Sequence, residues 1–395
     1  MQNNTLSRAD LSNETGVAKD VHYGDVLIKF GEVLDISKEK LPMITDEKVL
    51  TKYKTSFLQN GDVVVADTAE DTTVGKCSEI AELNDEVVIS GLHTIPYRPV
   101  EKFATGYLGY YLNSDSYHNQ LIPLMQGIKV TSISKSAMQD TNIIYPNSKE
   151  EQAKIGKYFI TLDNLITLHQ RKLDHVKDLK KSMLQKMFPK NGQLYPEVRF
   201  PEFTDAWEQR KLGEISDKVT KKNQDVVVDE VFTNSAEYGI ISQRDFFDKD
   251  IANTENIDGY YVVEPNDFVY NPRISTTAPF GPIKRNKLER SGAMSPLYYV
   301  FRPNNVDLSY LEWFFQTSCW YPFMRFNGNS GARSDRFAIT DKIFNEMPIS
   351  LPQDIEEQKR IGMFLTTLDT LITLHQRELD HLKLLKKGML QQMFV

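Results

Sequence analysis

The sequence is poor in cysteine and has no long apolar run. Its two cysteines, Cys77 and Cys319, lie far apart in a chain of 395 residues, which excludes a disulfide framework and a thiolate metal site. No apolar run reaches the ~18 residues of a membrane span, and Met1 to Thr5 lack the pattern of a signal peptide. We therefore predict a cytoplasmic protein that does not enter a membrane.

The chain also lacks the basic excess of a simple nucleic-acid-binding protein. It holds 47 Lys and Arg against 54 Asp and Glu, a formal net charge of −7. Positive charge is concentrated locally, because residues 151–190 hold 9 Lys and Arg against 4 Asp and Glu. The remaining composition, 40% hydrophobic and 26% charged, is that of a globular protein, and the length predicts two domains.

An internal repeat is the most informative feature. Residues 151–188 return as residues 357–394, at a constant offset of 206. Each copy follows a proline, and Ser148 with Glu151 and Asp354 with Glu357 have the spacing of a helix N-terminus. We expect each copy to form one helix of about 38 residues, roughly 57 Å long.

Apolar residues in each copy recur at alternating steps of three and four, which predicts a heptad seam. The seam contains Ile155, Phe159, Leu162, Ile166, His169, Leu173 and Val176 in the first copy, and Ile361, Leu365, Leu368, Ile372, His375, Leu379 and Leu382 in the second. A two-faced helix of this length needs a partner. We predict that the two helices pack as an antiparallel coiled coil within one chain; a seam between two copies of the chain is the alternative.

Polar residues interrupt the seam at the same places in both copies. These are His169 with His375, and Lys180 with Lys386. A polar seam residue can specify register at a cost in stability, and we hypothesise that the two histidines do so. Partly exposed histidines without that role are the alternative.

The repeat continues weakly into the regions before each helix. Short β-type runs, at residues 63–66, 87–90, 260–263 and 297–301, alternate with helical stretches such as 103–112 and 308–317. The predicted fold class is therefore α+β, with two domains of mixed structure, each followed by a long helix. We predict a first domain over 1–147, a central helix over 148–190, a second domain over 191–353 and a C-terminal helix over 354–395.

This order resembles the specificity subunit of type I restriction-modification enzymes. The resemblance covers nearly the whole chain and is strongest in the second half, in Arg199–Phe203, Trp207–Gly213, Tyr270–Ser275, Ser295–Tyr299 and Gly331–Arg336. It implies two target-recognition domains that each bind one half of a bipartite, asymmetric site in double-stranded DNA. It further implies helices that set the gap and dock two adenine-N6 methyltransferase subunits, joined by two motor-nuclease subunits.

A protein that recognises DNA without covalent chemistry needs hydrogen-bond donors near base edges and cations near phosphates. Polar and basic loops of the second domain supply them, at Gln243, Arg244, Asn271, Arg273, Lys284, Arg285, Lys287, Arg325, Asn327, Asn329, Arg333 and Arg336. The first domain offers hydroxyls and fewer cations, at Thr72, Thr73, Lys76, His93, Thr94, Lys129 and Ser132. The alternative for each is an ordinary solvated loop residue.

The sequence carries no motif for catalysis, a cofactor or a metal. The glycines of residues 326–331 lack the strand, helix and ribose-binding acid of a dinucleotide site. Histidines 169 and 175, and 375 and 381, stand six apart, which does not place both on one metal ion. We expect a non-catalytic subunit without cofactors.

One segment of the second half has no counterpart in the first. Residues 199–213 precede the second domain, and at the offset of 206 their equivalents would lie before Met1. The first domain is thus expected to lack its opening element. Two other classes of protein stay open. One is a coiled-coil scaffold with two modules for ligands other than DNA, and the other is a methyltransferase, which would require a cofactor loop.

Overall fold

The computed structural model describes residues 1–190, 192–246, 257–330 and 335–394. Its chain divides into two compact units, of which unit 1 contains Met1–Arg171 and His375–Val395 and unit 2 contains Lys172–Leu374. Each unit combines one globular domain with parts of both long helices, α6 (Lys149–Lys186) and α11 (Ile355–Met393). Within the described part, no helix is both long and apolar enough to cross a membrane.

Unit 1 is built on two four-stranded sheets, with strand orders β1-β4-β2-β8 and β3-β7-β5-β9, and a short pair β10-β6. The strands are β1 (Leu11–Ser12), β2 (Ala18–Val21), β3 (Val33–Asp35), β4 (Met43–Ile44), β5 (Val63–Ala66), β6 (Thr68–Ala69), β7 (Cys77–Ala81), β8 (Val88–Ser90), β9 (Thr94–Tyr97) and β10 (Thr131–Ser132). The short helices are α1 (Tyr23–Ile28), α2 (Lys48–Lys52), α3 (Tyr107–Leu112), α4 (Asp115–Leu121) and α5 (Lys135–Met138).

Unit 2 repeats this plan with sheets β12-β19-β16-β17 and β14-β13-β18-β15 and the pairs β11-β22 and β20-β21. The strands are β11 (Glu208–Lys211), β12 (Ser216–Lys218), β13 (Val231–Ser235), β14 (Gly239–Ser242), β15 (Tyr261–Val263), β16 (Phe268–Tyr270), β17 (Ile283–Arg285), β18 (Gly292–Met294), β19 (Tyr299–Pro303), β20 (Asn329–Ser330), β21 (Phe337–Ala338) and β22 (Pro348–Leu351). The short helices are α7 (Gln243–Phe246), α8 (Leu308–Phe314), α9 (Tyr321–Asn327) and α10 (Asp341–Asn345).

A central strand in each unit is buried on both faces, which explains its continuous apolar sequence. In β5, Val63 and Val65 belong to one core cluster and Val64 to another. In β16, Phe268 and Val269 likewise separate into two clusters. The α+β prediction is confirmed, and β5 has the predicted bounds.

The two long helices begin as their sequences predict. The Ser148 hydroxyl accepts a hydrogen bond from the Glu151 amide at 3.2 Å. The Asp354 carboxylate accepts one from the Glu356 amide at 2.8 Å. Both side chains satisfy amides that the first helical turn leaves without a partner.

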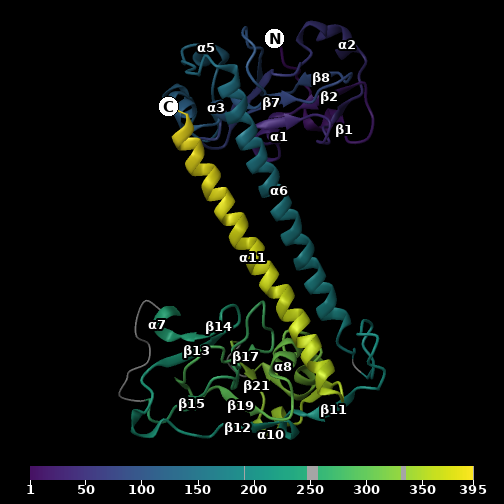
Figure 1. Cartoon of the computed structure of the whole chain (residues 1–395), viewed down its shortest axis with the longest axis vertical. Helices are drawn as coiled ribbons and strands as arrows, with labels where there is room; N and C mark the ends of the chain where they lie inside the picture. Colours follow the sequence, from purple (N-terminus) through teal and green to yellow (C-terminus); the bar gives the residue numbers. More distant parts are fainter. Residues whose placement is uncertain (191, 247–256, 331–334, 395) are drawn as a thin grey trace. The chain divides into compact units, whose positions relative to one another are not determined.

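The helices α6 and α11 run side by side and antiparallel (Figure 1). In unit 1, the Lys386 ammonium of α11 lies 2.6 Å from the Asp163 carboxylate of α6. In unit 2, Lys180 of α6 forms an ion pair with Asp369 of α11. Asp163, in the first half of α6, thus faces Lys386, near the end of α11. Lys180, near the end of α6, faces Asp369, in the first half of α11. An antiparallel pair requires this order. The prediction of an intramolecular coiled coil is confirmed.

The predicted seam residues lie between the helices or in the adjoining cores. Eight are buried, and the other six are half-buried. The buried ones are Phe159, Leu162, Leu173, Ile361, Leu365, Leu368, Leu379 and Leu382, and the half-buried ones are Ile155, Ile166, His169, Val176, Ile372 and His375. The rings of His169 and His375 meet edge to face with centroids 5.7 Å apart; their role in setting register stays a prediction.

A glycine in each helix allows close contact with the neighbouring domain. A Cβ on Gly156 would lie 2.5 Å from the Thr105 carbonyl oxygen, and one on Gly362 would lie 2.8 Å from the Tyr310 amide nitrogen. Both distances are shorter than atoms tolerate, so only glycine fits without a shift. This contact seats α6 on α3 and α11 on α8.

One buried carboxylate makes the stability of unit 1 depend on pH. Asp20 is fully buried, and burial raises its pKa to about 7, although the Asn4 amide donates a hydrogen bond to it at 2.5 Å. The folded state therefore favours the protonated acid. Between pH 4 and 7 the unfolded chain loses this proton first, so the free energy of unfolding should fall as the pH rises.

We predict that Asp20→Asn stabilises the protein at pH 8 and has little effect at pH 4. An amide can keep the contact with Asn4 without carrying a charge, so the gain should grow between pH 4 and 7, up to about 4 kcal/mol. Urea unfolding at several pH values measures this gain in the free energy of unfolding of unit 1. The exposed Asp140, changed to Asn, is the control, and a gain that is the same at every pH would refute the prediction.

Candidate nucleic-acid interface

Two segments of unit 2 that are far apart in the sequence lie side by side. The Pro272 carbonyl oxygen accepts a hydrogen bond from the Phe337 amide at 2.8 Å, and the Asp335 oxygen accepts one from the Ile274 amide at 3.0 Å. An isolated β-bridge joins Arg273 to Arg336. The structure thus brings together two arginines that the sequence analysis selected from separate loops.

Arg273 is exposed and Arg336 is half-buried. Neither forms an ion pair with any residue that the structure describes. A guanidinium group can bind a phosphate or the edge of guanine through two parallel hydrogen bonds. This pair of arginines is therefore a suitable DNA-binding surface.

Asn271 is placed differently from our expectation. It is only 7% exposed, its Nδ2 donates to the Asn234 carbonyl oxygen at 2.8 Å, and its Oδ1 accepts from the Arg273 amide at 2.9 Å. Both ends of its amide are used within the protein. Asn271 shapes the loop that presents Arg273 rather than reaching out from it.

The end of α9 leads to β20, which pairs with β21 directly after Arg336. Arg325 and Asn329 are exposed, whereas Asn327 is half-buried and donates to the Phe323 carbonyl oxygen at 2.9 Å. Phe326, which the sequence analysis did not select, is 90% exposed, and an exposed aromatic ring beside arginines can stack on a base. Arg333 lies outside the described residues.

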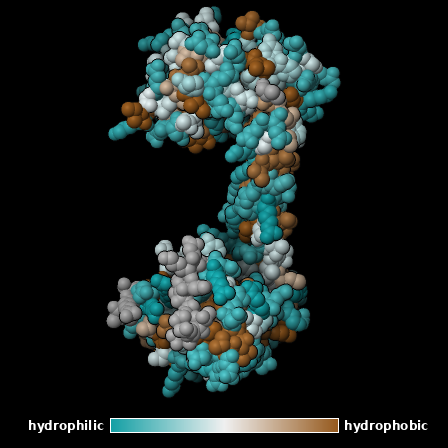
Figure 2. Space-filling model, turned by 90° about the vertical axis from the view of Figure 1, so that its left-hand side faces the viewer, coloured by the Kyte–Doolittle hydropathy of each residue, from teal (hydrophilic) through white to brown (hydrophobic). Residues whose placement is uncertain are grey.

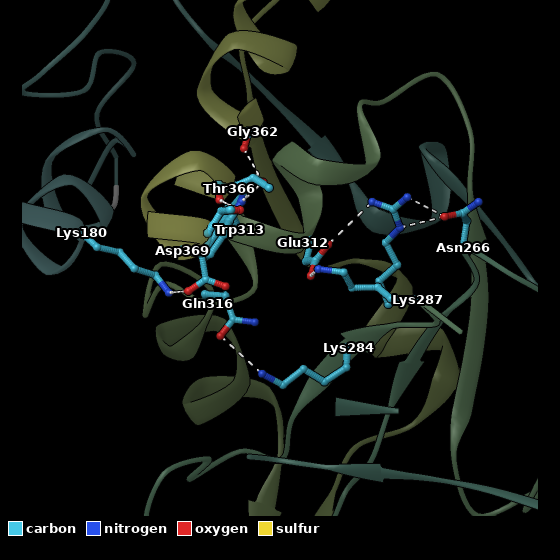
Figure 3. Close-up of polar contacts among 12 residues, drawn as sticks. Lys180, Asn266, Lys284, Lys287, Glu312, Trp313, Gln316, Gly362, Thr366 and Asp369 are labelled. Atoms are coloured by element: carbon cyan, nitrogen blue, oxygen red, sulfur yellow. Dashed lines mark hydrogen bonds and ion pairs between the residues drawn. The ribbon is translucent and has the colours of Figure 1, made fainter. Parts of the chain in front are cut away.

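The basic residues around β17 are engaged within the protein, as Figure 3 shows. Lys287 and Arg285 lie 3.1 Å and 3.6 Å from the Glu312 carboxylate of α8. Lys284 donates to the Gln316 side chain at 3.3 Å, and burial lowers its pKa. These cations hold β17 against α8, so they offer less free positive charge to DNA than the sequence indicated.

Gln243 and Arg244 form the first turn of α7, directly after β14. Gln243 is half-buried and Arg244 is exposed. Among the described residues, the Oε1 of Gln243 has no hydrogen-bond partner. Gln243 and Arg244 thus lie at the end of the β13–β14 hairpin, on a different segment of the chain from the Arg273 loop.

Unit 1 repeats the paired-segment arrangement with different side chains. The Asp67 carbonyl oxygen accepts a hydrogen bond from the Ile133 amide at 2.9 Å, and β6 pairs with β10 so that Thr68 faces Ser132. The exposed His93 lies 3.4 Å from Asp67. The structure thus brings His93 and Ser132 together with Thr68, a neighbour that the sequence analysis did not select.

The other residues selected in unit 1 divide between surface and interior. Thr72, Thr73 and Lys129 are exposed. Thr94 is buried and donates to the Gly91 carbonyl oxygen at 2.5 Å. Lys76 donates to the Leu27 carbonyl oxygen at 2.8 Å, and burial lowers its pKa. Thr94 and Lys76 therefore support the fold, because their polar groups are already bound inside it.

An apolar side chain of unit 1 stands out on the same loop as Lys129. Ile128 is fully exposed, and Val130 is 55% exposed. An exposed aliphatic group can contact a thymine methyl group or enter a base step. Ile128 was not predicted from the sequence, because polar residues were the expected DNA contacts in these loops.

The chain is similar to known proteins over most of its length. Residues 20–178 and 204–384 match the family described as type I restriction modification DNA specificity domain. A protein described as a type I restriction enzyme MjaX specificity subunit, from Methanocaldococcus jannaschii, is 24% identical over 91% of this chain and 81% of its own length.

A solved structure with a TM-score above 0.5 has the same fold. The S subunit of the type I restriction-modification system from M. genitalium matches with a TM-score of 0.57 and 13% identity, over 100% of this chain and 93% of that one. The HsdS subunit of Thermoanaerobacter tengcongensis matches with a TM-score of 0.44 and 19% identity, over 85% and 80% of the two chains. Because the family match covers most of the sequence in two segments, this chain belongs to the family of type I restriction-modification DNA specificity domains and carries two copies of that domain.

Proposed function

We propose that the two units each bind one half of a bipartite, asymmetric DNA site and that the helix pair sets the gap between the halves. The observation that carries this proposal is the presence of two DNA specificity domains with different surface loops in one chain. Unit 2 presents Arg273 and Arg336, whereas unit 1 presents His93, Ser132 and Lys129 at its paired segments. Different donors favour different bases, so the two halves of the site should differ in sequence.

We further propose that the chain performs no covalent chemistry and directs adenine-N6 methyltransferase subunits to DNA, with motor-nuclease subunits joining the complex. The long helices supply a docking surface, since apolar side chains are exposed along them (Figure 2). Leu168 of α6 is 45% exposed and Leu374 of α11 is 57% exposed. The two leucines are equivalent at the offset of 206, which supports two equivalent sites for methyltransferase.

The direct test is the methylation pattern of DNA in a bacterial host that lacks its own DNA methylation. We expect N6-methyladenine at a single split, asymmetric motif when the chain is expressed with its methyltransferase subunit, and none with the methyltransferase alone. Modification-sensitive long-read sequencing measures this. Methylation at the same sites without the chain would disprove a role in specificity.

Replacement of both Arg273 and Arg336 by alanine should weaken recognition of one half-site. Each arginine that contacts a base or a phosphate typically contributes ~1–3 kcal/mol, so we expect affinity of the methyltransferase complex for its motif to fall at least tenfold. Fluorescence anisotropy with a labelled duplex measures it.

The matched control for the two arginines is Lys287→Ala. Lys287 is already paired with Glu312, so its removal should change affinity less than threefold. Equal losses for the control and the double variant would show that the arginine pair has no special role.

Replacement of Leu168 or Leu374 by glutamate should reduce methyltransferase binding. A charge on an apolar contact is costly to bury, so each single variant should hold one methyltransferase subunit and the double variant none. Analytical ultracentrifugation measures the stoichiometry. The controls Leu168→Met and Leu374→Met keep an apolar side chain and should behave like the unchanged protein. If both glutamate variants still form the full complex, this surface is not the docking site for the methyltransferase subunits.

A further inference from the structure

A segment of unit 2 fills a groove that the equivalent part of unit 1 leaves open. In unit 2, the segment of residues 207–218 pairs with two strands, because its β11 pairs with β22 and its β12 pairs with β19. Trp207, Leu212 and Ile215 of this segment are at most 2% exposed. The segment therefore contributes both strand pairing and apolar burial to the core of unit 2.

An ion pair fixes the start of the same segment. The Arg199 guanidinium donates to both carboxylate oxygens of Glu357, at 2.7 and 2.8 Å. The Trp207 indole donates to the same carboxylate at 3.3 Å, and Glu357 is only 1% exposed. A buried carboxylate of this kind needs such donors, because an unpaired buried charge is costly.

The two units can be compared residue by residue because they share distinctive hydrogen bonds. Gln152 donates to the Pro146 carbonyl oxygen at 2.8 Å, and Gln358 donates to the Pro352 oxygen at 2.9 Å. These pairs stand 206 residues apart, so Glu151 is the counterpart of Glu357 and Ile143 that of Ile349.

A second shared contact identifies the equivalent sheets. Arg98 binds Asp62 through two hydrogen bonds, and Arg302 binds Asp267 in the same way. The strand β9 is therefore the counterpart of β19, since each leads directly to its arginine or contains it.

Unit 1 leaves these counterparts open. The strand β9 lies at the edge of its sheet, whereas β19 is flanked by β12 and β16. Residues 142–145 are not in a strand, and Ile143 is 44% exposed where Ile349 is fully buried. Glu151 is exposed, whereas its counterpart Glu357 is buried. An unpaired edge strand is a template for another strand.

An apolar hollow of about 490 Å³ lies beside β9. Its lining includes Val63, Tyr97, Leu108, Leu112, Met138 and Ile143. Val63 pairs with Tyr97 as Phe268 pairs with Phe301, and Gly156 meets the Tyr107 amide as Gly362 meets the Tyr310 amide. The counterparts of the lining residues in unit 2 are thus Phe268, Phe301, Leu311, Phe315, Phe344 and Ile349, which share one core cluster with Leu212 and Ile215. The hollow thus occupies the place that Leu212 and Ile215 fill in unit 2.

We propose that the hollow, β9 and residues 142–145 form a docking site for an extended polypeptide segment with the chemistry of residues 199–218. Its occupant carries an arginine for Glu151, a tryptophan eight positions later, and the leucine and isoleucine that fill the hollow. It binds by adding strands to β9 and to residues 142–145, so that backbone hydrogen bonds supply affinity and the pockets supply specificity.

The test is binding of a fluorescein-labelled peptide of residues 195–219 to the full chain, measured by fluorescence anisotropy. We expect saturable binding of one peptide per chain, because the groove of unit 2 is already filled by its own segment. Hydrogen exchange should show protection at residues 94–97 and 142–145 on binding. A peptide with Leu212→Asp and Ile215→Asp should bind at least tenfold more weakly.

Variants of the chain locate the site. Glu151→Gln removes the partner of the peptide arginine and should weaken binding about fivefold to tenfold, whereas Glu150→Gln, on the neighbouring exposed residue, should not. Ile143→Asp should abolish binding. The proposal is overturned if the peptide does not bind saturably, or if it binds Ile143→Asp as tightly as the unchanged chain. It is also overturned if the chain forms a dimer that buries Ile143 and excludes the peptide.

Discussion

The antiparallel contact between α6 and α11 is the constraint on which the cores of both units depend. In unit 1, Phe394, beyond the end of α11, stacks on Phe159 of α6 with ring centroids 5.7 Å apart, and both belong to the cluster that includes Tyr107. In unit 2, Phe188, beyond the end of α6, shares a core with Ile361 of α11. Each core is thus completed by segments that are distant in the sequence.

The ion pairs between the helices repeat with the same offset as the sequence. Lys180 pairs with Asp369, and Lys386 pairs with Asp163, so each copy supplies one lysine and one aspartate. Burial opposes the charge of Lys386, but the carboxylates of Glu32 and Asp163 raise its pKa. A shift of register would separate the partly buried Lys386 and Asp163 at a cost in stability, so the pairs favour one alignment of the helices.

The two units share a backbone plan but differ in the side chains at their paired segments. Unit 2 places Arg273 beside Arg336, and unit 1 places Thr68 opposite Ser132. The hydrogen bonds that form each loop are made largely by backbone atoms, so the exposed side chains can change without loss of the fold. A common fold with different loops is a physical basis for an asymmetric DNA site.

The sequence alone determined the long helices and the α+β class, and it favoured pairing of the helices within one chain. Heptad spacing and the repeat of residues 151–188 as 357–394 are sequence patterns that need no knowledge of tertiary contacts. The expected helix from residue 308 extends from Leu308 to Phe314, and the expected strand from residue 297 begins at Tyr299. Such shifts at the ends are normal, because the last residues of an element depend on their neighbours in space.

Only the tertiary structure decided which selected side chains are free. Asn271, Thr94 and Lys76 have suitable chemistry, but the fold uses their polar groups internally. Asp369 and Asp163 lie in the repeated segments, but residue type alone could not show that each pairs with a lysine of the other helix. A buried hydrogen bond or ion pair joins residues that are remote in sequence, and its existence depends on where the packed helices and sheets place them.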